Sequence, residues 1–385
     1  MMKLKIKVFS IDKMRKFPLL FGFLGALIGL ILRYAYIGGI PNFPFKNVIH
    51  SHSHVMLLGF LFNALLLLVW ANFTKGFDKI SYRIYIALQV FVALLLVAFI
   101  VQGYALYSIL FSTLHLFLSY VLLVRLWKRL EVKEGFHPLI KLGIIFHFLS
   151  SLGPYMLGPL MVFEMQESPW YQQAIFFYLH FQFFGVFFVW MLAILLQKTT
   201  AIITKNQTIA IAISLLFLFA HSLDYSFDHW GIQVFGGLGS LLLFVVLLGF
   251  KNDFQEVQLS YKYMYYIILF IGLMNIAGTI PNIANLVVEN RFMLIAWLHL
   301  LFLGMYIPFL WMNVVQRMNP LLWYIYGFVV LFSEAILVFP AQLSQWLSIS
   351  VMWLLFIAYL GVFLCISYVH LTLLFNKKEK LQKQL

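Results

Sequence analysis

Long apolar runs separated by short polar segments make up almost the whole chain. A helix needs about 20 apolar residues to cross the hydrocarbon core of a bilayer. Twelve runs fit that template, at approximately 17–38, 48–72, 83–103, 105–127, 138–162, 171–197, 207–225, 231–250, 263–285, 292–316, 320–340 and 346–375. The runs are continuous rather than alternating, which excludes a β-barrel. The pattern therefore predicts an all-α, multi-pass membrane protein with twelve transmembrane helices.

The composition agrees with this interpretation and limits the alternatives. Hydrophobic residues make up 63% of the chain and charged residues only 10%, which excludes an ordinary soluble domain. The loops are too short for a separate domain, so we expect one integral-membrane domain over 1–385, with basic tails at 1–16 and 376–385. The one cysteine, Cys365, excludes a disulfide framework and a thiolate cluster within one chain.

The distribution of basic residues predicts the orientation. The formal net charge is +13, which in a soluble protein would suggest nucleic acid as a partner. Here Lys and Arg fall in both tails and in alternate loops, so the positive-inside rule explains them without nucleic acid. The other loops carry acidic residues, namely Glu164, Glu167, Asp224, Asp228 and Glu289. Both termini are therefore predicted to be cytoplasmic, in a bacterial inner (plasma) membrane.

Six histidines are predicted to lie at a similar depth, toward the outer face. They come from the second, sixth, seventh and tenth runs and are His50, His52, His54, His180, His221 and His299. An imidazole in lipid must be hydrogen-bonded or must bind something. Imidazoles from four segments at one level predict a shared metal or heme. The alternative is that each one only forms a hydrogen bond to a neighbouring helix.

Helical spacing and nearby charges refine this hypothesis. His50 and His54 are four residues apart and share one helix face, whereas His52 points the other way. Glu334 is the only carboxylate well inside a predicted span. It could relay protons, accept a hydrogen bond from a ligand histidine, or pair with Arg33 or Arg291. Either arginine could bind a heme propionate or anchor its helix at the headgroups.

Three segments carry a family resemblance. They are HSHSHVMLLGFLFNALLLLVW at 50–70, YLHFQFFGVFFVW in the sixth run and WLHLLFLGMYIPFLW in the tenth. The first is similar to the second-helix pattern of the cbb3-type and nitric-oxide-reductase branches of heme–copper oxidase subunit I, in which a histidine begins a run like HTxxxxxGFxxNALL. It also resembles the HAHEMLFGF start of NnrS proteins. The family's twelve helices, with ligands in helices two, six, seven and ten, match the predicted bundle.

The resemblance implies ligands and also a departure from the family. It implies heme binding by His54 and His299, with Arg291 at a propionate. His50, His52, His180 and His221 would then bind copper or another metal that takes nitrogen ligands. The family's second histidine in helix ten is replaced by Leu301, and His221 stands without the adjacent histidine of the copper pair. A complete oxygen-reducing binuclear site is therefore not expected.

Three functions follow as hypotheses. The first is a membrane-embedded heme- or copper-binding redox protein, an oxidoreductase if it turns over a substrate, with an electron donor or other membrane subunits as partners. The second is a transporter or delivery protein for Cu or Zn, which would capture the ion at the HSHSH mouth. The third is a cofactor-free structural or assembly protein. An optical spectrum separates the first from the other two.

Overall fold

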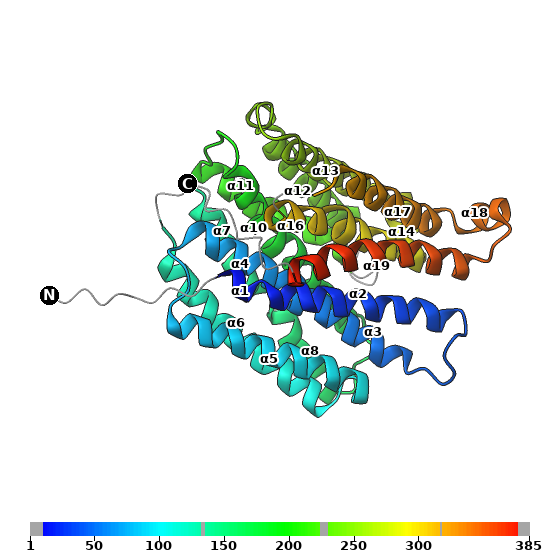
Figure 1. The fold of residues 1–385 in the computed structure, drawn as a ribbon. Coiled ribbons are helices and arrows are strands. Elements are labelled where there is room, and N and C mark those ends of the chain that lie inside the picture. The colour runs from blue at the N-terminus through cyan, green and yellow to red at the C-terminus, as the bar shows by residue number, and fades with distance from the viewer. Residues whose placement is uncertain (1–10, 132–134, 224–229, 316–317, 376–385) are drawn as a thin grey trace. The chain divides into compact units, whose positions relative to one another are not determined.

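The computed structural model describes residues 11–131, 135–223, 230–315 and 318–375, and its elements are helices (Figure 1). The all-α prediction is confirmed for these residues. The predicted basic tails lie outside the described residues except for residues 11–16. The same holds for Asp224 and Asp228, which were expected in an outer loop.

Eleven helices within the described ranges are long and apolar enough to cross a membrane. They are Lys16–Tyr36, Phe45–Phe73, Lys79–Gln102, Leu106–Arg129, His137–Val162, Pro169–Leu196, Trp230–Leu248, Leu259–Ala277, Arg291–Val314, Pro320–Val338 and Val351–Phe375. The chain is thus a multi-pass membrane protein by the length and composition of its helices. The predicted run 207–225 instead forms a 14-residue helix, α11 (Lys205–Leu218), followed by a 3-10 turn, η4 (Phe219–Ser222). At 1.5 Å per residue α11 is only about 21 Å long.

The chain folds as two compact units, and the prediction of one domain over 1–385 is not tested by this division. Unit 1 combines Met1–Leu126 with Arg291–Leu385, and unit 2 is Trp127–Asn290. Unit 1 contains α1 (Ile11–Met14), α2 (Lys16–Tyr36), α3 (Phe45–His54), η1 (Val55–Phe62), α4 (Asn63–Phe73), α5 (Lys79–Gln102), α6 (Leu106–Arg129, whose last turn enters unit 2), α15 (Arg291–His299), η6 (Leu300–Tyr306), α16 (Ile307–Val314), α17 (Pro320–Val338), α18 (Pro340–Leu347) and α19 (Val351–Phe375).

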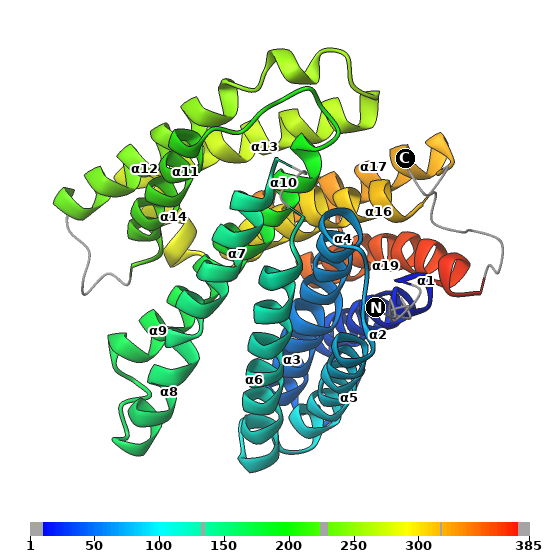
Figure 2. The ribbon, with the colours of Figure 1, turned by 90° about the vertical axis from the view of Figure 1, so that its left-hand side faces the viewer.

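Unit 2 contains the remaining helices, and it includes three antiparallel neighbours. They are α11, α12 (Trp230–Leu248) and α13 (Leu259–Ala277), of which α12 packs against both others (Figure 2). A capping box between Thr204 and Gln207 begins α11, which satisfies backbone N–H groups that a helix start leaves open. The other elements are α7 (His137–Ser150), α8 (Leu152–Val162), α9 (Pro169–His180), η3 (Phe181–Phe188), α10 (Val189–Leu196), η4, η5 (Asn252–Phe254) and α14 (Pro281–Glu289).

Three glycines on α2 allow other helices of unit 1 to approach its backbone closely. A Cβ atom on Gly22 would lie 2.5 Å from Cε1 of His370. A Cβ on Gly25 would overlap Met56, and one on Gly29 would overlap the hydroxyl of Tyr359. Small residues at such spacing are typical of tightly packed membrane helices. Accordingly α2 and α19 run side by side, as Figure 1 shows.

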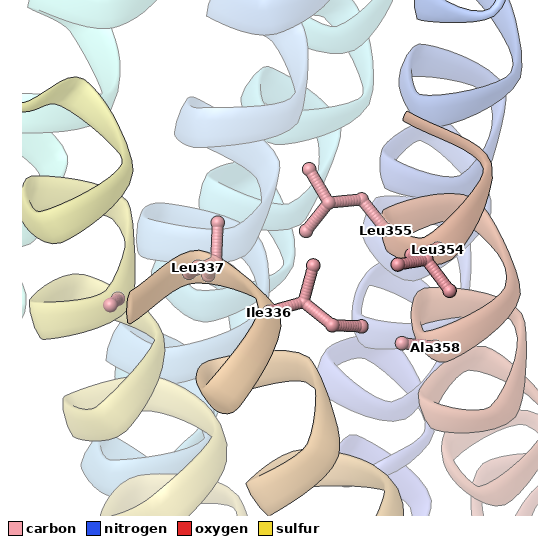
Figure 3. Packing of buried hydrophobic residues seen from close by; sticks show 6 residues of the cluster. Ile336, Leu337, Leu354, Leu355 and Ala358 are labelled. Atoms are coloured by element: carbon pink, nitrogen blue, oxygen red, sulfur yellow. The ribbon is translucent and has the colours of Figure 1, made fainter. Parts of the chain in front are cut away.

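An apolar cluster joins α15, α17 and α19 and fixes the helices that carry His299 and Glu334. Its buried members are Ala296, Ile336, Leu337, Leu354, Leu355 and Ala358, five of which are labelled in Figure 3. Ala296 precedes His299 by about one helical turn, and Ile336 follows Glu334 by two residues. The packing of these side chains therefore sets the spacing of the two helices at the level of both polar residues.

Replacing Ile336 by Ala tests this cluster. Ile336 is fully buried, so the loss of its side chain should lower the free energy of unfolding in detergent by about 2–4 kcal/mol. Leu331→Ala is the matched control on the same helix, because Leu331 is 70% exposed and its side chain faces away from the packed cluster. Equal losses from both variants would contradict the role given to the cluster.

Candidate functional site

Five polar side chains from five helices of unit 1 form what we call the outer polar cluster: Arg33, His52, His299, Glu334 and Tyr359. Nδ1 of His299 lies 3.6 Å from Oε1 of Glu334. His52 lies within electrostatic range of His299 and Arg33. Arg33 in turn lies within electrostatic range of Tyr359 and Glu334. In the predicted orientation all five belong to the outer half of the membrane.

His52 lies on the side of α3 that faces α2. Its Nδ1 is 2.8 Å from the backbone carbonyl oxygen of Gly25. A carbonyl oxygen only accepts, so Nδ1 carries the proton, and the neutral ring keeps a lone pair on Nε2. Gly29 makes room for this ring, since a Cβ there would lie 3.0 Å from Cε1 of His52. The hydrogen bond thus fixes both the tautomer and the orientation of the imidazole.

Glu334 and His299 bring a carboxylate and an imidazole together between two helices that are long and apolar enough to cross a membrane. Both carboxylate oxygens of Glu334 and Nδ1 of His299 are buried. Within the described residues, none of these three atoms has a hydrogen-bond partner. At 3.6 Å the two groups attract each other electrostatically but do not form a hydrogen bond. Buried polar groups without partners are costly and are typical of sites with a function.

Arg33 and Tyr359 complete the cluster around α2. The hydroxyl of Tyr359 donates a hydrogen bond to the carbonyl oxygen of Ala26 at 3.3 Å. Arg33 lies in the last turn of α2 and is always charged, so it supplies a positive charge near the carboxylate of Glu334. The sequence suggested an Arg33–Glu334 interaction, but it gave no indication that Tyr359 belongs to the same group.

His50 and His54 lie on the opposite side of α3 from His52, as the helical spacing predicted. Nδ1 of His54 donates to the carbonyl oxygen of His50 at 2.9 Å, and the hydroxyl of Tyr104 lies 3.3 Å from its Nε2. Phe99 packs against His54 with ring centroids 4.3 Å apart, and Tyr104 packs against His50 at 4.6 Å. Both nitrogens of His54, the expected heme ligand, therefore have partners, namely the backbone of its own helix and the hydroxyl of Tyr104, which follows α5.

The sequence pattern that carries the family resemblance aligns its histidine with His52 rather than with His54. In the pattern HTxxxxxGFxxNALL the histidine stands seven residues before the glycine. Counted back from Gly59 in this chain, that position is His52. Arg291, the expected propionate partner, is the exposed first residue of α15. Arg291 stands about two turns before His299. The arginine of the outer polar cluster is Arg33 instead.

The other two predicted metal ligands, His180 and His221, lie in unit 2. Nε2 of His180 donates to the carbonyl oxygen of Leu215 at 2.9 Å, and the Ser222 hydroxyl lies 3.4 Å from its Nδ1. His221 contacts Oε1 of Gln233 and the hydroxyl of Ser240, both at 3.0 Å. Each imidazole thus forms hydrogen bonds between neighbouring helices. The predicted metal or heme centre would need ligands from both units, and it stays a prediction.

A repeated pattern connects three of the histidines. His54, His180 and His299 each immediately precede a π-helix, namely η1, η3 and η6. In each case a glycine follows five residues after the histidine: Gly59, Gly185 and Gly304. π-Helices are rare and are frequent at functional sites. The spacing H-x-x-x-x-G recurs in the second, sixth and tenth predicted spans of the sequence, and it leaves their hydropathy unchanged.

Comparisons with known proteins add no family assignment. No protein-family model matches the chain, and no curated protein matches it. Within the described residues, no group of three or more His, Cys, Asp or Glu side chains is arranged to hold a metal ion.

Gly29→Ala tests the geometry of the outer polar cluster. The new Cβ would overlap the Tyr359 hydroxyl, so we expect a loss of about 1–3 kcal/mol in the free energy of unfolding. In a Tyr359→Phe background the loss should shrink, because the overlapping oxygen is gone. Gly327→Ala is the control, since a Cβ there meets nothing within 4 Å and alanine favours the helix. Equal effects at both glycines would contradict the described packing.

Proposed function

We propose that this chain is a membrane-embedded redox protein that binds one heme through His52 and His299. The observation that carries the proposal is the orientation of the two rings. Nδ1 of His52 is directed at the Gly25 carbonyl oxygen, and Nδ1 of His299 is directed at the Glu334 carboxylate. In both rings this leaves Nε2 as the nitrogen available to a metal. Ligand histidines usually donate their other N–H to a backbone carbonyl or a carboxylate; His52 makes such a hydrogen bond, and His299 has the carboxylate of Glu334 at 3.6 Å.

Two imidazoles fit a heme better than a bare metal ion. Porphyrin supplies four nitrogens to its iron, so two protein ligands complete the coordination. A bare Zn or Cu ion usually takes three or four protein ligands, and such a group is not formed within the described part of the chain. Arg33 supports the same choice, because its guanidinium suits a propionate and it lies in the same cluster.

The chain's own residues would set the properties of the heme. When bound, heme iron supplies one-electron chemistry, which serves electron transfer or the handling of a small gas such as nitric oxide or oxygen. The Gly25 carbonyl would orient the ring of His52, and the Glu334 carboxylate would orient the ring of His299 by electrostatic attraction. Copper is left out of the proposal, since His180 and His221 are engaged in hydrogen bonds to neighbouring helices.

The proposal includes twelve crossings with both termini in the cytoplasm. Lys198 precedes α11 and Lys205 begins it, while Lys251 lies in the link from α12 to α13 and Lys262 in the first turn of α13. The positive-inside rule places all four lysines on one side. Because α12 is long enough to cross, α11 must cross as well. Together α11 and η4 extend over Lys205–Ser222, which supports a short seventh crossing.

The absorption spectrum of the purified protein tests the heme proposal. Wild-type protein, prepared in mild detergent from cells supplied with heme precursor, should show a Soret band and, after reduction, the sharp α-band of a six-coordinate heme. His52→Ala and His299→Ala should each lose the α-band, since each removes one of the two proposed nitrogen ligands. His54→Ala is the matched control on the same helix and should keep the spectrum.

Two results would reject this assignment. A wild-type protein that is folded but colourless under these conditions would favour the cofactor-free hypothesis. Loss of heme in His54→Ala with retention in His52→Ala would restore the ligand pair expected from the sequence. Elution as a single species from a sizing column identifies which variants are folded.

Labelling of single cysteines tests the seventh crossing. In a Cys365→Ser background, Thr200→Cys and Lys251→Cys should react only with reagent applied from the cytoplasmic side, and Trp230→Cys only with reagent from outside. Trp230 is 82% exposed, so access to the reagent depends on its side of the membrane. If α11 does not cross, Trp230→Cys will share the side of Thr200→Cys, and Lys251→Cys will react from the opposite one.

A further inference from the structure

A small cavity lies in unit 1, between α1 and the ends of α2, α4, α16 and α19 that are predicted to be cytoplasmic. Its volume is about 40 Å³. A single water needs roughly 10–15 Å³ on this measure, so the cavity holds more than one. Most of its wall is apolar, with Leu67, Leu68 and Leu310 among the lining residues. It shares no residue with the outer polar cluster.

Two buried polar groups on the cavity wall are complementary. His370 is fully buried, and its Nδ1 donates to the carbonyl oxygen of Leu19 at 3.0 Å. Its Nε2 is therefore an acceptor. Trp311 is 1% exposed, and its Nε1–H is a donor only. Within the described residues, neither His370 Nε2 nor Trp311 Nε1 has a hydrogen-bond partner.

The position of the imidazole is fixed by its surroundings. The ring of Trp311 stands at 80° to the ring of His370, with centroids 6.4 Å apart. Phe60 packs on the imidazole at 5.3 Å. Gly22 supplies the space, because a Cβ there would lie 2.5 Å from Cε1 of His370. His370 and Trp311 thus offer one acceptor and one donor on a cavity wall that is otherwise apolar except for buried Arg15.

We propose that this cavity binds the hydroxyl group of a small apolar molecule, a short alcohol or the hydroxyl end of a longer one. The hydroxyl donates to Nε2 of His370 and accepts from Nε1–H of Trp311. A carbonyl cannot donate and an ammonium cannot accept, so neither satisfies both atoms. The apolar wall favours a carbon body over a second and third water. The proposal does not depend on the heme site.

Photolabelling with 3-azibutanol, a short alcohol that carries a diazirine, tests the site in the full-length protein in detergent. Mass spectrometry should find the label on cavity-lining residues such as Leu67 and Leu310. Trp311→Phe and His370→Asn should each reduce this labelling about tenfold, the effect of one lost hydrogen bond. Asparagine retains an N–H for the Leu19 carbonyl but removes the acceptor at Nε2, so the two variants remove the acceptor and the donor separately.

Two controls separate hydroxyl recognition from simple apolar binding. The methyl ether of the probe cannot donate, and it should label the cavity weakly and equally in all variants. Trp346→Phe, at a residue 79% exposed, should label like the wild type. Equal labelling by alcohol and ether, or unchanged labelling in both cavity variants whose melting temperatures match the wild type, would overturn the proposal and leave a cavity that holds water or apolar groups only.

Discussion

Hydrogen bonds from side chains to the backbone of α2 hold α3 and α19 against this helix of unit 1. The carbonyl oxygens of Leu19, Gly25 and Ala26 accept from His370, His52 and Tyr359, respectively. The hydrocarbon core offers no water to a buried N–H or O–H, so each of these donors needs a protein acceptor. A helical carbonyl can serve because its oxygen has a second lone pair. The glycine face of α2 is what brings the donors close enough.

Hydropathy predicts most of this architecture because every helix that crosses the lipid needs about 20 apolar residues. Continuous apolar runs gave the positions of eleven long helices. The 207–225 run was the exception, since its α-helix ends at Leu218 and passes into a 3-10 turn. Average hydrophobicity does not detect such a change in backbone hydrogen bonding. Whether a short helix still crosses depends on its neighbours and on the lysines at its ends.

The candidate site was predictable only in part, for reasons that particular residues make clear. Helical periodicity separated His52 from His50 and His54, and the structure shows these two faces. Periodicity alone cannot indicate which face meets the rest of the bundle, because that depends on Gly25 and Gly29 of a different helix. The π-helices after His54, His180 and His299 likewise arise from a shift in backbone pairing, to which hydrophobic patterns are insensitive. Glu334 was noticeable because it is a carboxylate in an apolar run.

The three acceptors on α2 also limit how the protein can move. Leu19 and Gly25 belong to one continuous helix, so a rotation of that rod about its axis would turn both carbonyls at the same time. The imidazoles of His370 and His52 would have to follow or lose their acceptors. A disturbance beside the cavity is therefore mechanically connected to the outer polar cluster through one rigid helical segment about 9 Å long, and neither imidazole can be reoriented without consequence for the other.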